Sequence, residues 1–165
     1  MRTLVTGGAG FIGSHVVDAF IAAGHHVAIV DNLSTGKQEN LNPQAAFYQL
    51  DIRDAERLHR VVQQEQPEVI SHQAALADLR GSLREPVTYA AVNILGSITV
   101  LEAARRYGVR KVLYASTGGA VYGEPVHLPV TERHPVDPLD PYGASKHAVE
   151  HYLFAYRHNY GLQYV

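Results

Sequence analysis

Tyr142 and Lys146 are the residues of this 165-residue chain whose types and spacing are best suited to catalysis. They follow Asp140-Pro141, a pair typical of a helix start, and residues four apart on a helix project from one face. A phenol with a pKa of about 10 is a poor base at neutral pH, but a neighbouring ammonium favours the phenolate. The pair could therefore take a proton from a substrate hydroxyl while hydride leaves for an oxidised cofactor. Taken alone, the pattern is weak, because it recurs by chance and most helical lysines are solvated.

A glycine-rich turn near the N-terminus could hold that cofactor. Gly7, Gly10 and Gly13 lie between a short strand-like stretch, residues 1–6, and an apolar-periodic segment, residues 11–23. This order of strand, glycine turn and helix is typical of loops that bind the pyrophosphate of a dinucleotide at a helix N-terminus. A side chain at the first two glycines would hold the pyrophosphate away, and one at the third would push the helix off the strand. By itself the spacing G-x-x-G-x-x-G fits a structural turn equally well.

Asp31 indicates which dinucleotide the turn would hold. It ends a second apolar stretch, residues 26–30, and lies 18 residues after Gly13. An acidic side chain at that place can accept both hydroxyls of the adenosine ribose and would repel a 2′-phosphate. We therefore expect NAD as the cofactor, not NADP, with the polar loop at residues 32–37 lying over it.

The composition fits one soluble globular domain, with 46% hydrophobic and 18% charged residues. The net charge of −2 comes from scattered residues, and no uninterrupted apolar run reaches the length of a membrane span. We expect neither a nucleic-acid nor a membrane partner. Zero cysteines exclude disulfides and thiolate metal sites and are compatible with the cytoplasm, the expected location. No metal is predicted, because His147 and His151 are one helical turn apart but have no evident third ligand.

Apolar stretches of strand length alternate with helical patterns along the chain. This alternation predicts an α/β fold with a doubly wound parallel sheet of the Rossmann type, in three layers α/β/α. Residues 117–139 are expected to form a loop, and residues 1–165 a single domain that ends within a sixth strand, residues 162–165. The other expected strands are residues 26–30, 47–50, 69–72 and 111–116, and the expected helices are residues 11–23, 55–66, 86–107 and 142–161.

The candidate residues lie at one edge of the predicted sheet. Ligands of such sheets bind beyond the carboxyl ends of the strands. The glycine turn, Asp31, Asp51, Ala74-Ala75 and Ser116-Thr117 all follow predicted strands, which favours a cofactor site over a structural turn. Thr117 could hydrogen-bond the same substrate oxygen as Tyr142, although most such threonines only cap turns.

Several ordered motifs resemble those of the extended short-chain dehydrogenase/reductase family, and within it the UDP-glucose 4-epimerases and their close relatives. The resemblance runs the whole length of the chain. It is carried by Thr6 to Ser14, Asp31-Asn32-Leu33, Asp51-Ile52, His72 to Ala75, Asn93 to Gly96, Ser116-Thr117, Val121-Tyr122-Gly123 and Tyr142 to Lys146.

The resemblance implies a role for each matching residue. Tyr142 would be the catalytic base, Lys146 its partner, and Thr117, beside Ser116, the hydroxyl residue on the substrate side. Residues 51 and 52 would contact adenine, and Gln73, Ala74, Ala75 and Ala77 would line the cofactor trough. The cofactor-binding residues expected are Gly7, Gly10, Phe11, Ile12, Gly13, Asp31, Asn32, Thr35, Gly36, Asp51, Ile52, Gln73, Ala74, Ala75, Ala77, Asn93, Ser116, Tyr142 and Lys146.

The implied reaction is epimerisation at C4 of a nucleotide-sugar such as a UDP-hexose. Tyr142 would deprotonate the sugar 4-hydroxyl, NAD⁺ would accept hydride, and hydride would return to the other face of the rotated 4-keto sugar. A sugar-nucleotide 4,6-dehydratase or a reductase is a lesser alternative. The dehydratases carry an Asp-Glu pair after the threonine, where this chain has Gly118-Gly119.

The resemblance also predicts what this length of chain can do. By the same resemblance, family members continue into a smaller domain that grips the nucleotide-sugar, and we expect that C-terminal substrate domain to be absent here. We expect NAD binding with little or no turnover; the rival interpretation is a non-catalytic NAD-binding module or an engineered scaffold. Relatives pair the helices that begin near Pro86 and Tyr142 across a two-fold axis, so a homodimer is expected.

Overall fold

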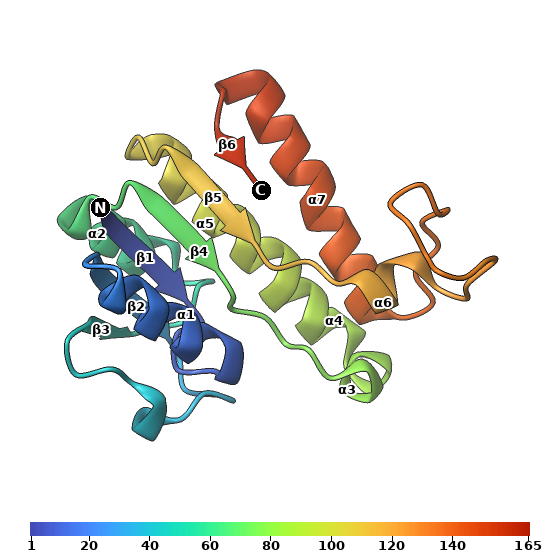
Figure 1. Ribbon diagram of the computed structural model, residues 1–165, viewed down its shortest axis with the longest axis horizontal. Helices are drawn as coiled ribbons and strands as arrows, with labels where there is room; N and C mark the ends of the chain where they lie inside the picture. The colour runs from blue at the N-terminus through green and yellow to red at the C-terminus, as the bar shows by residue number, and fades with distance from the viewer.

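Six parallel strands form one sheet in the computed structural model, which describes residues 1–165. The strand order β3-β2-β1-β4-β5-β6 confirms the predicted doubly wound sheet (Figure 1). The sheet grows in opposite directions from β1, so the carboxyl ends of β1 and β4 flank the point where ligands of such sheets bind. The strands are β1 (Arg2–Thr6), β2 (His26–Asp31), β3 (Ala46–Gln49), β4 (Val69–His72), β5 (Lys111–Tyr114) and β6 (Gln163–Tyr164).

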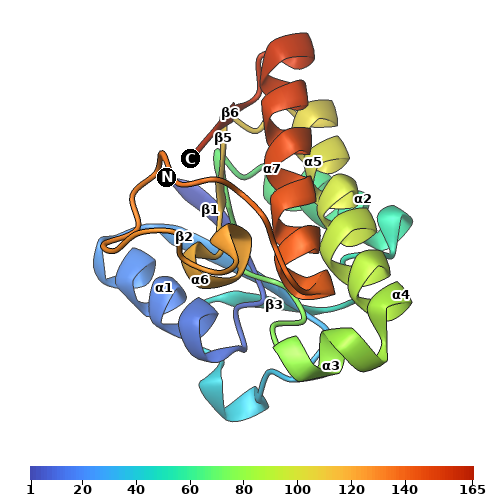
Figure 2. The ribbon, with the colours of Figure 1, turned by 90° about the vertical axis from the view of Figure 1, so that its right-hand side faces the viewer.

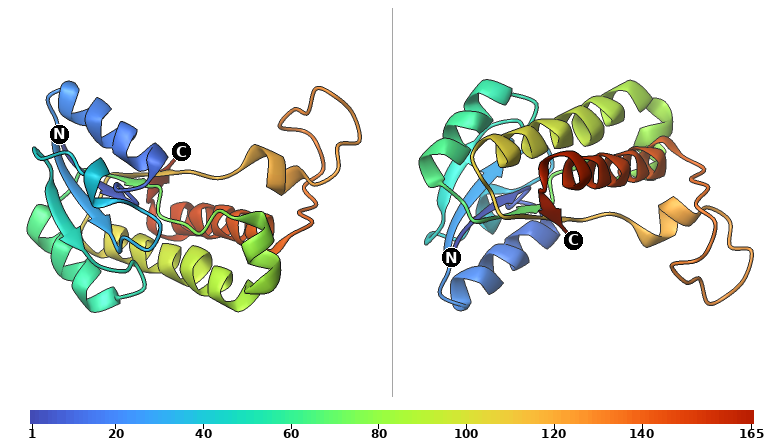
Figure 3. Two further views of the ribbon diagram at one scale, coloured as in Figure 1. Left: turned by 90° about the horizontal axis from the view of Figure 1, so that it is seen from below. Right: turned by 90° about the horizontal axis from the view of Figure 1, so that it is seen from above.

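Helices cover both faces of the sheet, which gives the expected three layers (Figure 3). Helix α1 (Phe11–Ala22) packs on β1 and β2 from one side. On the other side α2 (Ala55–Glu65), α5 (Ser97–Arg106) and α7 (Pro141–Tyr160) lie in a row. Asp54 and Asp140 cap α2 and α7 by accepting backbone N–H groups, as helix-start aspartates do.

The core is divided by the sheet into a large and a small part. The larger cluster has 19 buried residues and includes Leu4, Ile70 and Leu101 beneath α2, α5 and α7. The smaller cluster, Val5, Val17, Val27 and Ile29, lies beneath α1. Each fully buried aliphatic side chain contributes about 1.5–3 kcal/mol, so these clusters fix the strands whose ends carry the candidate residues.

The predicted helix at residues 86–107 is a composite of three segments. Helix α4 (Pro86–Tyr89) continues into a π-helical segment, η2 (Ala90–Gly96), and then into α5. It runs beside α7 for much of its length (Figure 2). By length and composition alone, Pro86–Arg106 could cross a membrane, which the sequence analysis did not anticipate. In this fold its apolar side packs into the core through residues such as Val100 and Leu101, which accounts for that composition.

Three short elements were not predicted: the 3₁₀ turn η1 (Gln38–Asn40), α3 (Leu79–Arg84) and α6 (Gly118–Tyr122). Two of them depend on a single capping side chain. Asp78 accepts the N–H groups of residues 80 and 81, and Thr117 accepts that of Ala120. The expected loop over residues 117–139 is therefore wrong for residues 118–122, because a local cap outweighs the low helix propensity of two glycines.

Candidate active site

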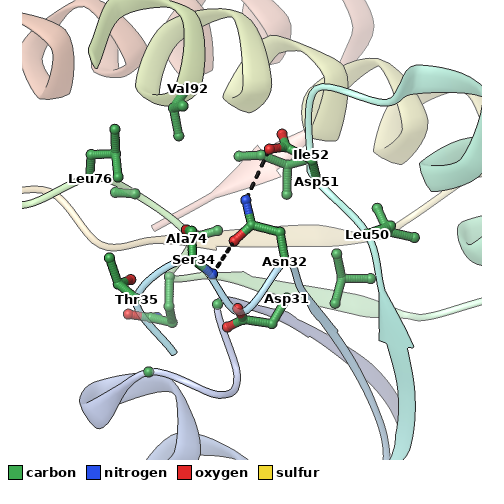
Figure 4. Close-up of a pocket in the computed structure, with 15 residues that line it drawn as sticks. Asp31, Asn32, Ser34, Thr35, Leu50, Asp51, Ile52, Ala74, Leu76 and Val92 are labelled. Atoms are coloured by element: carbon green, nitrogen blue, oxygen red, sulfur yellow. Dashed lines mark hydrogen bonds between the residues drawn. The ribbon is translucent and has the colours of Figure 1, made fainter. Parts of the chain in front are cut away.

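A groove with about 550 Å³ of empty space lies at the carboxyl ends of β1, β2, β3 and β4 (Figure 4). It brings together segments that are far apart in the sequence, as the topology predicts. The lining residues are Gly7, Gly10, Val30, Asp31, Asn32, Ser34, Thr35, Leu50, Asp51, Ile52, Gln73, Ala74, Ala75, Leu76 and Val92.

The glycine turn approaches its neighbours too closely for side chains. Gly7 has φ +73°, and a Cβ there would lie 2.6 Å from the backbone nitrogen of Ala74. A Cβ at Gly13 would lie 2.0 Å from the carbonyl oxygen of Gly7. Gly7 is thus needed for the approach of β1 to the segment after β4, in addition to the expected approach of a ligand. The backbone cradle that remains at the start of α1 fits a pyrophosphate.

Asp31 is held rigidly at the wall of the groove. Its carboxylate is 8% exposed; Oδ2 accepts the N–H of Ala9 at 3.0 Å, and Oδ1 accepts the N–H of Leu33 at 2.8 Å. Each carboxylate oxygen can accept a second hydrogen bond. The side chain can therefore receive ribose hydroxyls without moving. Gly36 makes this possible, because a Cβ there would lie 3.0 Å from Asp31 Oδ1.

Asp51 forms a second fixed anion at the far end of the groove. It accepts hydrogen bonds from Arg53 Nε at 2.9 Å and Nη2 at 2.8 Å, and from Asn32 Nδ2 at 2.9 Å. The hydrogen bonds from the Arg53 side chain are the main reason that the pKa of Asp51 falls to about 2. Asp51 is therefore an acceptor at all ordinary pH values, beside the apolar Leu50 and Ile52. This combination suits a flat base with an exocyclic amine.

Lys146 is buried, contrary to the usual behaviour of a helical lysine. Lys146 lies in the second turn of α7, and the residue is 3% exposed. Nζ donates to the carbonyl oxygen of Ala115 at 2.7 Å and lies 4.8 Å from the centre of the Tyr114 ring. Burial lowers the pKa of Lys146 to about 8. The two other N–H donors of the ammonium remain free for a ligand.

Tyr142 lies on α7 and Thr117 at the start of α6, two helices in contact with each other; neither residue, nor Lys146, lines the groove. Asp140 accepts the N–H of Gly143 at 2.8 Å and so fixes the first turn of α7, which carries Tyr142. Thr117 Oγ1 accepts the N–H of Ala120 at 3.5 Å, so it does cap a turn, yet its own hydroxyl proton stays available. Ser116, expected near the cofactor, instead donates to Glu150 Oε1 at 2.5 Å.

Other expected residues do not line the groove. Phe11 and Ile12 are 79% and 64% exposed, so only their backbone N–H groups, in the first turn of α1, can serve a ligand. Asn93 is 1% exposed and lies behind the wall, where Oδ1 accepts the N–H of Leu76 at 2.8 Å. Ala77 also lies outside the lining. The expected set lacked five lining residues, Val30, Ser34, Leu50, Leu76 and Val92. The first three gave a signal, because Val30 and Leu50 directly precede Asp31 and Asp51, and Ser34 lies in the polar loop expected over the cofactor.

The two histidines considered as metal ligands are close together. His147 Nε2 lies 3.1 Å from His151 Nε2, and His147 Nδ1 lies 2.9 Å from Glu150 Oε2. No group of three or more acidic, histidine or cysteine side chains is arranged to hold a metal ion. The absence of a metal requirement stays a prediction.

The fold and the groove define a dinucleotide-binding α/β domain, and comparison with known proteins gives the family. Residues 3–165 match the NAD dependent epimerase/dehydratase family, to which the chain belongs. The expectation of NAD is confirmed at the level of the family. So is the resemblance to UDP-glucose 4-epimerases, since relatives with that name match nearly the whole chain.

Two relatives and two solved structures show the extent of the match. A putative UDP-glucose 4-epimerase of Methanocaldococcus jannaschii is 50% identical over 98% of this chain and 52% of its own length. The UDP-glucose 4-epimerase of Mycolicibacterium smegmatis is 47% identical over 98% of the chain and 53% of its own length. The Thermus thermophilus enzyme in complex with NAD has a TM-score of 0.97 at 50% identity. The match covers 99% of this chain and 53% of that one.

The Thermotoga maritima enzyme with UDP-glucose has a TM-score of 0.98 at 49% identity, again with 99% of this chain and 53% of that one covered. The chain therefore spans about half the length of the curated relatives it matches. Because this half contains the whole groove described above, the comparison bears on the cofactor site more directly than on the substrate.

Gly7→Ala and Gly24→Ala should separate backbone strain from close packing. Both glycines have positive φ, +73° and +78°, but a Cβ at Gly24 meets nothing within 4 Å. Gly24→Ala should lower the free energy of unfolding by about 1–2 kcal/mol. Gly7→Ala should lower it by about 1–3 kcal/mol more, because its Cβ overlaps the backbone of Ala74. Urea unfolding followed by circular dichroism measures both, and equal losses would show that the turn relaxes freely.

Lys146→Met should change how stability depends on pH. The folded-state pKa of about 8 lies below the ordinary value of 10.5, so the unfolded chain binds more protons between these values. The free energy of unfolding then rises with pH through that window, by up to about 3 kcal/mol. Methionine removes the charge and this rise, so the wild-type curve minus the variant curve should climb from pH 8 to 10.5.

Urea titrations at several pH values give both curves. Lys37→Met, at a side chain that is 69% exposed, is the control and should show no such climb. A flat difference curve for Lys146→Met would contradict the burial of a charged ammonium.

Proposed function

We propose that this chain is the NAD-binding part of a nucleotide-sugar 4-epimerase of the UDP-glucose/UDP-galactose type. The observation that carries the proposal is the groove itself. Its glycine turn leaves backbone N–H groups at the start of α1 beside the groove, and the fixed carboxylate of Asp31 lies where it can accept ribose hydroxyls. The identity of about 50% to UDP-glucose 4-epimerases, one solved with NAD and one with UDP-glucose, supports the choice of reaction.

The catalytic role is assigned to Tyr142, with Lys146 as its partner. The buried ammonium of Lys146 is held by the carbonyl oxygen of Ala115, and Lys146 follows Tyr142 by one turn of α7. The phenolate of Tyr142 then removes the proton of the sugar 4-hydroxyl and later returns it. Thr117 can donate its hydroxyl proton to the same oxygen. NAD, when bound, supplies a reversible acceptor for the hydride of sugar C4.

The chain covers about half the length of each relative, which bears on how much catalytic activity these residues can have. The glycine turn, Asp31 and Asp51 line one groove, so NAD should bind. Nothing in the structure forms a second wall for a nucleotide-sugar, so we infer little or no turnover of UDP-hexose by these 165 residues. The same observation favours the second candidate, a non-catalytic NAD-binding module.

A dehydratase remains the lesser candidate. Dehydratase chemistry needs an acid to protonate a leaving hydroxide, and the positions after Thr117 are Gly118 and Gly119. A Cβ at either glycine would meet nothing within 4 Å, so space does not exclude larger residues there. The chain therefore lacks the carboxyl group that dehydratases carry at these positions, although there is space for it.

A homodimer is part of the proposal. Large apolar side chains are exposed on the neighbouring helices of the composite segment and α7, among them Val87, Leu95, Phe154 and Tyr160 at 80%, 61%, 64% and 58%. Exposed apolar side chains on two neighbouring helices favour a protein interface there, and two-fold pairing is the commonest arrangement.

Isothermal titration calorimetry with NAD is the direct test of the cofactor assignment. The wild-type chain should bind NAD and bind NADP at least about tenfold more weakly, a difference of about 1.4 kcal/mol. Asp31→Asn should weaken NAD binding by a similar factor and reduce the discrimination, because the amide no longer repels a 2′-phosphate. Asp18→Asn, the same change on an exposed face of α1, is the control and should leave binding unchanged. Absence of heat with NAD would refute the proposed function.

Tyr142→Phe distinguishes an enzyme from a binding module. With UDP-galactose and NAD, any fluorescence of reduced nicotinamide formed by the wild-type chain should disappear in Tyr142→Phe, while NAD affinity stays within about twofold. Tyr152→Phe, at a half-exposed position of the same helix, is the matched control and should keep the signal. A signal that survives Tyr142→Phe would refute its role, and epimerisation at full rate would refute the inference of low turnover.

A further inference from the structure

A row of buried polar side chains lies behind the groove and connects the elements that form it. Five side chains are involved, Thr6, His72, Ser97, Asn93 and Ser145, and none is more than 2% exposed. They come from β1, β4, the composite helix and α7. None lines the groove, so the proposed reaction leaves them without a role.

The hydrogen bonds around His72 have a defined direction. Ser97 Oγ donates its only proton to the carbonyl oxygen of Asn93 at 2.5 Å, so it must accept from His72 Nε2 at 2.8 Å. His72 Nε2 therefore carries the ring proton, and Nδ1 accepts the hydroxyl proton of Thr6 at 2.6 Å. Thr6 Oγ1 in turn accepts the N–H of Ala74 at 3.3 Å. Each group therefore donates to the next in one direction: Ala74 N–H to Thr6, Thr6 to His72, His72 to Ser97, and Ser97 to the carbonyl oxygen of Asn93.

The imidazole of His72 stays neutral over the working range of pH. It is buried among the side chains above, and burial, with a smaller contribution from the charge of Lys146, lowers its pKa to about 3. A neutral imidazole with one donor and one acceptor matches its two partners, whereas an imidazolium would present two donors. The ring also packs against Tyr114, with centroids 5.7 Å apart.

Asn93 extends the connection to the catalytic helix. Its Oδ1 accepts the N–H of Leu76 at 2.8 Å, and its Nδ2 donates to the carbonyl oxygen of Leu76 at 3.0 Å and to Ser145 Oγ at 2.9 Å. Ser145 Oγ donates to the carbonyl oxygen of Tyr142 at 2.7 Å. Asn93 lies in the π-helical segment η2, a rare local geometry that is frequent at functional sites.

We propose that His72 is a positioning residue that sets the spacing between the groove wall, residues 74–76, and the composite helix. Through Asn93 and Ser145 it also sets the first turn of α7, which carries Tyr142. In this proposal His72 does not contact a ligand. It acts by holding in place the backbone groups that line the groove. The expected effect of His72 on NAD affinity rests on the proposed function. Its expected effect on the stability of residues 74–76 does not, because that is a property of the chain without a ligand.

The test compares His72→Phe with Ile70→Ala. Phenylalanine fills the site and removes both hydrogen bonds; Ile70 is a fully buried apolar residue on the same strand and face, so its truncation destabilises the core without touching the polar row. Amide hydrogen exchange at Ala74 and Leu76 reports local opening, and calorimetry reports NAD affinity. Urea unfolding gives the global stability against which both are compared.

His72→Phe should accelerate exchange at Ala74 and Leu76 by about tenfold more than its loss of global stability accounts for, and weaken NAD binding by about tenfold. Ile70→Ala should show no such excess. His72→Asn and His72→Gln each reproduce one ring nitrogen and should restore part of both quantities. The proposal would be overturned if exchange at Ala74 and Leu76 followed global stability equally in His72→Phe and Ile70→Ala, and if His72→Asn and His72→Gln restored neither slow exchange nor NAD affinity.

Two further variants keep the test decisive if His72→Phe does not fold. Thr6→Val and Ser97→Ala each remove one partner of the imidazole, and each should give a smaller excess of exchange at Ala74 and Leu76. Exchange that matches global stability in both variants would again overturn the proposal. Failure of the wild-type chain to bind NAD would refute the proposed function, while the exchange comparison would still decide the role of His72.

Discussion

The parallel pairing of β1 with β4 is the interaction on which the site depends. In this register Thr6 lies opposite His72, so both strands end at the same level and their next residues, Gly7 and Gln73-Ala74, run on side by side. The close approach of Gly7 to Ala74, the groove between the glycine turn and the wall, and the hydrogen bond from Thr6 to His72 all follow from that one register. A shift by one residue would turn every side chain of β4 to the other face of the sheet.

The two ends of the site use charge in opposite ways. At the end with Asp31 and Asp51, carboxylates are held in place by N–H groups and by a guanidinium, so they point in fixed directions. Near the start of α7, the ammonium of Lys146 is buried against one carbonyl oxygen and an aromatic face, with a pKa of about 8. The first arrangement suits recognition of hydroxyls, and the second leaves two N–H donors of the ammonium for a ligand.

The sequence predicted the elements whose signals are local and repeated. Strand β2 contains a continuous apolar run, β1 and β4 each contain a pair of adjacent aliphatic residues, and α2 and α7 have aspartate caps and regular apolar spacing, so their positions were predictable. The short helices α3 and α6 were not, because each depends on one capping side chain and on contact with α7. The π-helical segment has no known sequence signature that could have predicted it.

The site was predictable where spacing determines it and unpredictable where packing does. The glycine turn, Asp31, Asp51 and Gln73 to Ala75 were identified from their places at strand ends, and the structure brings them into one groove. The burial of Lys146, the position of Asn93 behind the wall and the partners of His72 depend on contacts between segments distant in the sequence. Those contacts follow from the pairing of the strands and from the packing of the composite helix and α7 on the sheet and on each other, which periodicity alone does not specify.

The two hydrogen bonds that hold Asp31 have a consequence for altering nucleotide preference by design. Because the carboxylate also accepts the N–H of Ala9, in the glycine turn, and that of Leu33, in the following loop, Asp31 holds both segments in place in addition to the selectivity proposed for it. A simple exchange for a small or cationic residue would admit a 2′-phosphate but leave two backbone amides without an acceptor. A successful redesign must place a new oxygen at the same spot, so the substitutions that change selectivity have to extend to the residues around positions 9 and 33.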